Sequence, residues 1–181
     1  MPVEARTLEI ADHGLTCCVD YANLMAYHGG GAVFGATAAY RALQLAAKVL
    51  SGDGLWDRND LTIVSNHPGP GVAGAIEFVT RCVSSGRYEA ANSTGACGYG
   101  MRFECQMGDD ARTILLKLRD GFVPQRFFEF AERKRTGVAS ADEQRTLEDL
   151  KLHLSARLWE EPLEALFDLR GVTTEEERTC A

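Results

Sequence analysis

The feature that most constrains the fold is a histidine followed by three glycines, His28 to Gly31, which runs directly into a long helical pattern. Glycine tolerates unusual backbone angles and carries no side chain, so this segment lets backbone amides come close to a ligand or to another part of the chain. The first amides of the following helix are unpaired and carry partial positive charge. The stretch therefore suits a ligand, anion or metal beside His28, and equally a helix start packed tightly on a neighbour.

The helix predicted after these glycines is the clearest in the chain. Apolar residues repeat at spacings of three and four from Val33 to Leu50, and Ser51 to Gly54 supplies the glycine expected past a helix end. Nearer the N-terminus, residues 7–10 suit a first strand or an ordered arm. Another helix is predicted there from Asp12 onward, before the glycines. One face of that helix would carry residues at spacings of four, three and four: Cys17, Tyr21, Leu24 and His28.

The middle of the chain alternates strand and helix patterns. The β-branched run 61–65 predicts a buried strand, and the two prolines and two glycines of 66–71 predict a rigid turn that presents His67 at the end of that strand. A helix is predicted over 72–83. Three strands are predicted next, over 88–91, 99–105 and 113–118. A hairpin at 108–110 is expected to join the last two of them.

The last third of the chain is predicted to be helical, over 125–135 and 141–159, with a hinge at 137–140. Residues 161–170 are interpreted as a short docking segment. We therefore expect an α+β fold with an α-β-α-β-β-β core, in which helices flank a mixed sheet. The expected organisation is a core over 1–122, a helical extension packed on it over 123–172, and an acidic tail over 173–181.

Charge and composition narrow the class of protein. A net charge of −7 with no basic stripe argues against a nucleic-acid partner, and no apolar run reaches the roughly 18 residues of a membrane span. The first residues lack the apolar core of a signal peptide, so we expect a cytoplasmic protein. Its six cysteines would then be reduced, and the absence of a Cys-x-x-Cys pair excludes a zinc ribbon.

Three segments resemble, in order, the motifs of the FmdE-like family, which is named after a component of formylmethanofuran dehydrogenase. In that family, the first motif is Phe or Tyr followed by His-Gly-His-x-Cys-Pro-Gly and by a helix of small residues that contains a Gly and an Arg. The second motif is Asp-Ala-Ile-Gln-x-x-Thr-Gly-Cys-Thr. The third motif, near the end, is Leu-Pro-x-Glu-Glu-Leu-Phe. The counterparts here are Tyr27 to Ala32 continuing to Gly35 and Arg41, then 74–83, then 161–167. The resemblance spans most of the chain and implies the same core order, a homodimer and a zinc-like metal.

The chain departs from the family at several ligand positions. The second histidine of the first motif is Gly30 here, and the cysteine after it is Ala32. The turn before the second helix reads Pro-Gly-Pro-Gly over 68–71 where the family has a cysteine, and no cysteine-rich zinc finger follows the third motif. Only His28 and Cys82 match the family's functional positions outright.

A site for zinc or another divalent transition metal needs three or four ligands drawn from His, Cys and carboxylate. The resemblance supplies His28 and Cys82, and the predicted turn brings His67 as a third; Asp20 or Tyr21 offers a fourth. The alternatives stay open, because a buried cysteine is commonly a core thiol and a lone histidine is commonly hydrogen-bonded.

The same cleft could hold a small molecule without a metal. His28 and His67 are then the candidate general acids or bases, and the amides of Gly29, Gly30 and Gly31 could hold an oxyanion or a carboxylate. A second glycine-rich loop, 94–100, carries Cys97, although it also suits a plain β-turn. An aromatic ligand would contact Tyr27, Phe34 and Tyr99.

Two functions follow as hypotheses. The first is a metal- or small-molecule-binding protein similar to that family, with an enzymatic role in one-carbon or redox metabolism as one form of it. The second is a non-catalytic accessory protein that has lost the metal and keeps the fold for interaction. An esterase is disfavoured, because the chain has no Gly-x-Ser-x-Gly nucleophile elbow to accompany its His-Gly-Gly-Gly segment.

Overall fold

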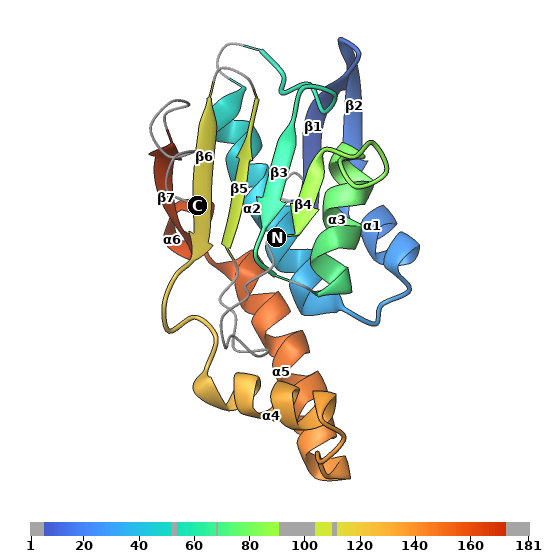
Figure 1. The fold of residues 1–181 in the computed structure, drawn as a ribbon, viewed down its shortest axis with the longest axis vertical. Helices are drawn as coiled ribbons and strands as arrows, with labels where there is room; N and C mark the ends of the chain where they lie inside the picture. The colour runs from blue at the N-terminus through green and yellow to red at the C-terminus, as the bar shows by residue number, and fades with distance from the viewer. Residues whose placement is uncertain (1–5, 52–53, 68, 91–103, 110–111, 173–181) are drawn as a thin grey trace.

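The computed structural model describes residues 6–51, 54–67, 69–90, 104–109 and 112–172. In these ranges a mixed sheet of five strands, in the order β4-β3-β5-β6-β7, packs against helices, and a two-stranded hairpin stands beside it (Figure 1). The predicted α+β fold with a helical C-terminal part is confirmed. The elements are β1 (Thr7–Asp12), β2 (Leu15–Asp20), α1 (Tyr21–His28), α2 (Val33–Leu50), β3 (Thr62–Ser65), α3 (Pro70–Thr80), β4 (Tyr88–Ala90), β5 (Glu104–Gly108), β6 (Thr113–Leu118), α4 (Gln125–Arg135), α5 (Ala141–Glu160), α6 (Leu163–Leu166) and β7 (Phe167–Val172). No helix of the described ranges is long and apolar enough to cross a membrane.

The helix α2 is the centre of the hydrophobic core. Its alanines are almost all fully buried, which lets α3, α5 and α6 approach it closely. The hydroxyl of Tyr40 donates to the carbonyl oxygens of Arg6 and Val19, at 2.9 and 2.8 Å, and so ties α2 to the hairpin. The predicted helix over 33–50 is therefore confirmed, and it is buried on most of its circumference.

The contact between α2 and α3 depends on glycine. A Cβ atom at Gly71 would lie 2.5 Å from the carbonyl oxygen of Ala32 and 2.9 Å from the backbone nitrogen of Ala36. Neither backbone atom can move without displacing α2, so only glycine fits at this position. A Cβ atom at Gly74, one turn further along α3, would meet the ring of His28 at 2.6 Å.

This geometry predicts that Gly71→Ala destabilises the protein by about 1–3 kcal/mol, because the added methyl overpacks the junction between two helix backbones. The measurement is the free energy of unfolding in urea, followed by circular dichroism. Gly31→Ala is the matched control, since nothing lies within 4 Å of a Cβ atom there. Equal stability of the two variants would contradict the tight junction.

The C-terminal helices pack on the core through aromatic contacts. The ring of Trp159 in α5 meets the ring of Tyr21 edge-on at a centroid distance of 4.8 Å. The guanidinium of Arg41 in α2 lies 4.9 Å from the Trp159 ring centroid and donates to the carbonyl oxygen of Glu161. These contacts fix the C-terminal half of α5, whereas its N-terminal half extends away from the sheet beside α4 (Figure 1).

The helix predicted to begin at Asp12 is wrong up to Asp20, because Asp12 ends the first strand and residues 13–20 form the turn and second strand of the β1–β2 hairpin. His13 and Gly14 both have positive φ, 52° and 77°, which is the geometry of a two-residue hairpin turn. Helix α1 begins only at Tyr21, where the Asp20 carboxylate accepts the Ala22 N–H at 2.7 Å. The three-four spacing of Cys17, Tyr21 and Leu24 thus crosses a strand–helix boundary.

Strand β7 is a second departure, within the extension expected to be helical over 123–172. After α5 the chain forms one more helical turn, α6, and then β7. Strand β7 pairs antiparallel with β6, which places Phe167 opposite Leu118 and Leu169 opposite Leu116. The sheet therefore ends on a strand from the C-terminal part of the chain. The leucines and phenylalanine of this segment lie at spacings that suit a helix as well as a strand. The segment forms a strand because it can pair with β6.

The remaining elements lie close to their predicted positions. Helix α3 ends at Thr80 rather than 83, because Arg81 takes a left-handed conformation with φ 55°. The described part of β5 spans Glu104–Gly108, and residues 99–103 of the strand predicted there lie outside the described ranges. Strands β5 and β6 pair antiparallel, as the predicted hairpin between them requires, and residue 110 of that hairpin lies outside the described ranges.

Candidate functional site

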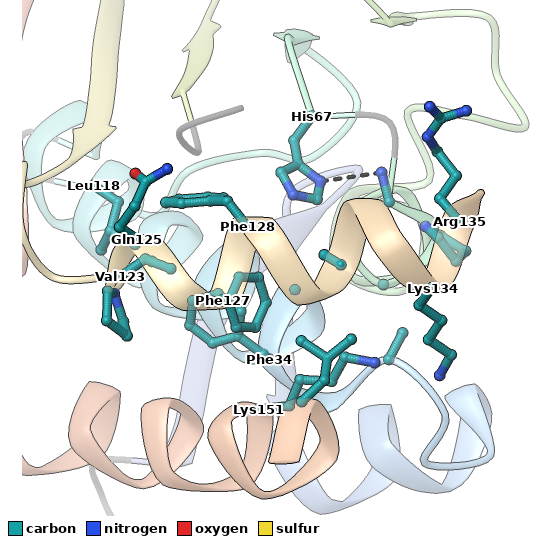
Figure 2. A pocket seen from close by; sticks show the side chains of 18 of the residues that line it. Phe34, His67, Leu118, Val123, Gln125, Phe127, Phe128, Lys134, Arg135 and Lys151 are labelled. Carbon is teal, nitrogen blue, oxygen red and sulfur yellow. Dashed lines mark hydrogen bonds between the residues drawn. The ribbon is translucent and has the colours of Figure 1, made fainter. Parts of the chain in front are cut away.

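A cavity of about 730 Å³ lies between α4, α5, the N-terminal ends of α2 and α3, and the segment that follows β6 (Figure 2). It is lined on the α2 and α3 side by small residues, which leave space beside the tight helix junction. These include Gly31, Ala32, Gly35, Gly69 and Gly71. The glycines that bring the two helices together therefore also form one wall of the cavity.

Aromatic rings form the apolar side of the cavity. Phe127 meets Phe34 edge-on at a centroid distance of 5.4 Å, and Phe128 meets Phe127 edge-on at 5.7 Å. All three rings are half-buried, and Leu118 and Val123 extend the same apolar lining. Such a surface stabilises the apolar body of a small molecule by removing it from water.

His67 supplies a directed polar group. It follows β3, and the backbone N–H of Gly69 donates to its Nδ1 at 3.0 Å, as the dashed line in Figure 2 shows. Since Nδ1 accepts this bond, the neutral ring carries its proton on Nε2. Burial lowers the pKa of His67 below its ordinary value of 6.5, which keeps the ring neutral at pH 7. Nε2 has no hydrogen-bond partner among the described residues.

The rim of the cavity carries more positive than negative charge. The ammonium groups of Lys134 in α4 and Lys151 in α5 share one carboxylate, that of Glu148, at 2.8 and 3.0 Å. Helices α2, α3 and α4 all begin at the cavity, and none of them has an acidic residue in its first turn or a side-chain cap. Their positive ends add to the charge of the shared lysines. Asp120, which also lines the cavity, pairs with Lys117 at 3.2 Å.

The cavity gathers only part of the predicted site. His67, Gly31 and Phe34 line it, whereas His28 does not. The Nε2–H of His28 donates to the carbonyl oxygen of Pro70 at 3.1 Å, and its ring covers Gly74. His28 thus holds the start of α3 against α1.

The other predicted ligand-binding residues also lie elsewhere or outside the described ranges. Tyr27 is 60% exposed and packs on Phe78, at a ring-centroid distance of 5.3 Å. Gly29 and Gly30 adopt positive φ, 66° and 78°, in the exposed turn after α1, so their conformation explains the glycines without a ligand. Cys97 and Tyr99 fall within 91–103, which the structure does not describe.

The structure does not bring the predicted metal ligands His28, His67 and Cys82 together. Cys82 is fully buried, and its thiol donates to the carbonyl oxygen of Leu61 at 3.4 Å. Burial raises the pKa of this thiol, which disfavours the thiolate that zinc requires. Across the described residues, no three or more His, Cys, Asp or Glu side chains are grouped so that they could hold a metal ion.

Sequence reasoning missed the half of the cavity that α4 and α5 provide. Helix α4 carries three phenylalanines, yet no residue of this helix is fully buried. Three phenylalanines within four residues of a short, charged helix are the sequence signal that could have indicated an aromatic cavity wall. The contribution of Lys151 could not be found from spacing, because it depends on how α5 folds back beside α4.

Compared with protein-family models and with curated proteins, the chain matches none. The resemblance to the FmdE-like family stays a prediction from the motifs.

The lowered pKa of His67 predicts a pH dependence of stability. The unfolded chain binds a proton near pH 6.5, while the folded chain binds it only at lower pH, so the unfolding free energy falls as the pH drops below about 6.5. His67→Asn keeps an acceptor for the Gly69 N–H but removes this titration, and should flatten the slope. Urea unfolding across this pH range measures it.

His153, exposed on α5, provides the control for that experiment. His153→Asn makes the same substitution at an exposed side chain and should keep the wild-type slope. A His67→Asn variant with an unchanged slope would contradict the burial of a neutral imidazole at this position.

Proposed function

We propose that this chain binds a small organic anion with an apolar body in the cavity beside α4. The observation that supports this most directly is an imidazole N–H without a hydrogen-bond partner among the described residues, which lies in the same cavity as a wall of half-buried aromatic rings. A cavity of this size suits a molecule of the size of a small metabolite or cofactor fragment.

The lining divides the ligand into two parts. Its apolar body would pack against Phe34, Phe127 and Phe128, whose edge-to-face rings leave a continuous hydrophobic surface. Its acceptor oxygen would take the hydrogen bond from Nε2 of His67. The lysine pair at the rim, with two ammonium groups for one carboxylate, favours a ligand that carries negative charge.

The tautomer of His67 favours binding over base catalysis. A general base needs an unprotonated nitrogen facing its substrate, and here Nδ1 is occupied by the Gly69 N–H while Nε2 carries the proton. The ring can donate to a carbonyl or carboxylate oxygen and polarise it. This supports the small-molecule form of the function expected from the sequence, at a site centred on His67 rather than on His28 or Cys82.

The test is fluorescence titration with 8-anilinonaphthalene-1-sulfonate, an aromatic molecule with one anionic group. We expect saturable binding, and at least about a tenfold weaker affinity for Phe128→Ala, because the loss of one ring face removes roughly 1.5 kcal/mol or more of hydrophobic contact. Phe130→Ala is the matched control, since Phe130 lies on the same helix, is also half-buried and does not line the cavity.

A charge variant tests the other half of the proposal. Lys151→Ala should weaken binding, with a smaller dependence on salt than the wild type, whereas Lys48→Ala on α2, outside the cavity lining, should not. Equal effects of Phe128→Ala and Phe130→Ala, or unsaturable fluorescence, would refute a specific site in this cavity.

A further inference from the structure

The strand β7 forms one edge of the main sheet, and within the described ranges β6 is its only strand partner. An edge strand leaves alternate backbone N–H and C=O groups free to pair with another strand. Natural edges are usually shielded by charge, proline or bulges. Here the middle of the edge carries Leu169, which is 41% exposed, between the exposed charged residues Asp168 and Arg170.

The register with β6 identifies which backbone groups point outward. The N–H of Arg119 donates to the carbonyl oxygen of Leu166 at 3.0 Å, directly beyond the last pair of the β6–β7 ladder. Hydrogen-bonded pairs alternate along an antiparallel ladder, so Asp168 and Arg170 use their backbone groups toward β6. Leu169 therefore directs its N–H and C=O away from the sheet.

We propose that a second copy of this chain pairs with β7, antiparallel and about a two-fold axis at Leu169. In this register Leu169 exchanges two backbone hydrogen bonds with its copy, and the two five-stranded sheets become continuous. Each Asp168 then lies opposite Arg170 of the other copy. These are non-hydrogen-bonded pairs, in which the side chains on opposite strands are closest.

The charge pattern of β7 selects this register over its neighbours. An axis at Asp168 would place the two aspartates directly opposite each other, and an axis at Arg170 would oppose the two arginines; both arrangements are unfavourable. Arg170 has no ion-pair partner among the described residues, whereas Asp168 pairs with Arg119 at 3.3 Å across an exposed contact. In the proposed dimer, the second copy supplies a carboxylate to Arg170.

The surface beside the strand is suited to the same contact. The C-terminal end of α2 and β7 border a shared surface depression, to which the exposed side chains of Val49 and Leu169 both contribute. Lys48 and Glu164 form an ion pair at its margin. An apolar centre with a charged margin is the usual anatomy of a protein interface.

The experiment measures the mass of the full chain by light scattering after gel filtration. We expect twice the 19.8 kDa of one chain for the wild type. Arg170→Asp and Asp168→Arg should each weaken the dimer at least tenfold, because each places like charges opposite one another. When the two variants are mixed, every 168–170 pair joins opposite charges, and a heterodimer should form.

Two further variants separate the interface from the fold. Leu169→Pro removes the outward N–H while leaving the bonds to β6 in place, and should give a folded monomer by circular dichroism. Arg126→Asp, the same charge change on exposed α4, should stay dimeric. A monomeric wild type, a dimer unaffected by Leu169→Pro, or variants that do not complement each other when mixed would each overturn the proposal.

Discussion

The structure depends on the contact between the first turns of α2 and α3, where Gly71 lies against the backbone of Ala32 and Ala36. Because the two helices touch backbone to backbone, the segment between β3 and α3 is held next to the N-terminal end of α2. His67 and the glycine-rich start of α2 are thereby placed on the same wall of one cavity. The core behind this contact is the alanine-rich face of α2, so the position of the site is set by the best-packed part of the molecule.

Two histidines secure this segment in different ways. His28 donates to the Pro70 carbonyl from the end of α1, and His67 accepts the Gly69 N–H from within the segment itself. The first bond occupies Nε2 of His28 and gives that residue a structural role. The second occupies Nδ1 of His67 and leaves its Nε2–H directed at the cavity. His28 and His67 were both candidate site residues, and both bond to the backbone of this short segment, but only His67 keeps a ring N–H that faces the cavity.

Much of the fold could be predicted from periodicity alone. The repeat over 33–50 and the alternation of β6 are local signals, and the structure contains both of them. The β1–β2 hairpin was missed because its turn uses a histidine at positive φ, which no apolar pattern announces. Strand β7 was missed because its identity depends on pairing with β6, a contact between segments about 50 residues apart.

Site residues could be predicted from the sequence only where a local feature of the chain, such as a turn or a helix start, places them. The turn indicated His67, and the glycine-rich helix start indicated Gly31 and Phe34, all of which line the cavity. The motif order suggested Cys82 as a metal ligand, but spacing along a chain does not report that a thiol is buried beneath a carbonyl of its own core. The aromatic and cationic half of the cavity comes from α4 and α5, and α5 is held on the core by Trp159, which does not line the cavity.

The most direct test of the account is a crystal structure of the full chain grown with 4-bromobenzoate. The anomalous signal of bromine locates this apolar carboxylate without ambiguity. We expect a bromine peak among Phe34, Phe127 and Phe128, with a carboxylate oxygen within hydrogen-bond distance of Nε2 of His67. An ordered bromobenzoate bound elsewhere, with the cavity empty or filled by the chain's own side chains, would contradict it.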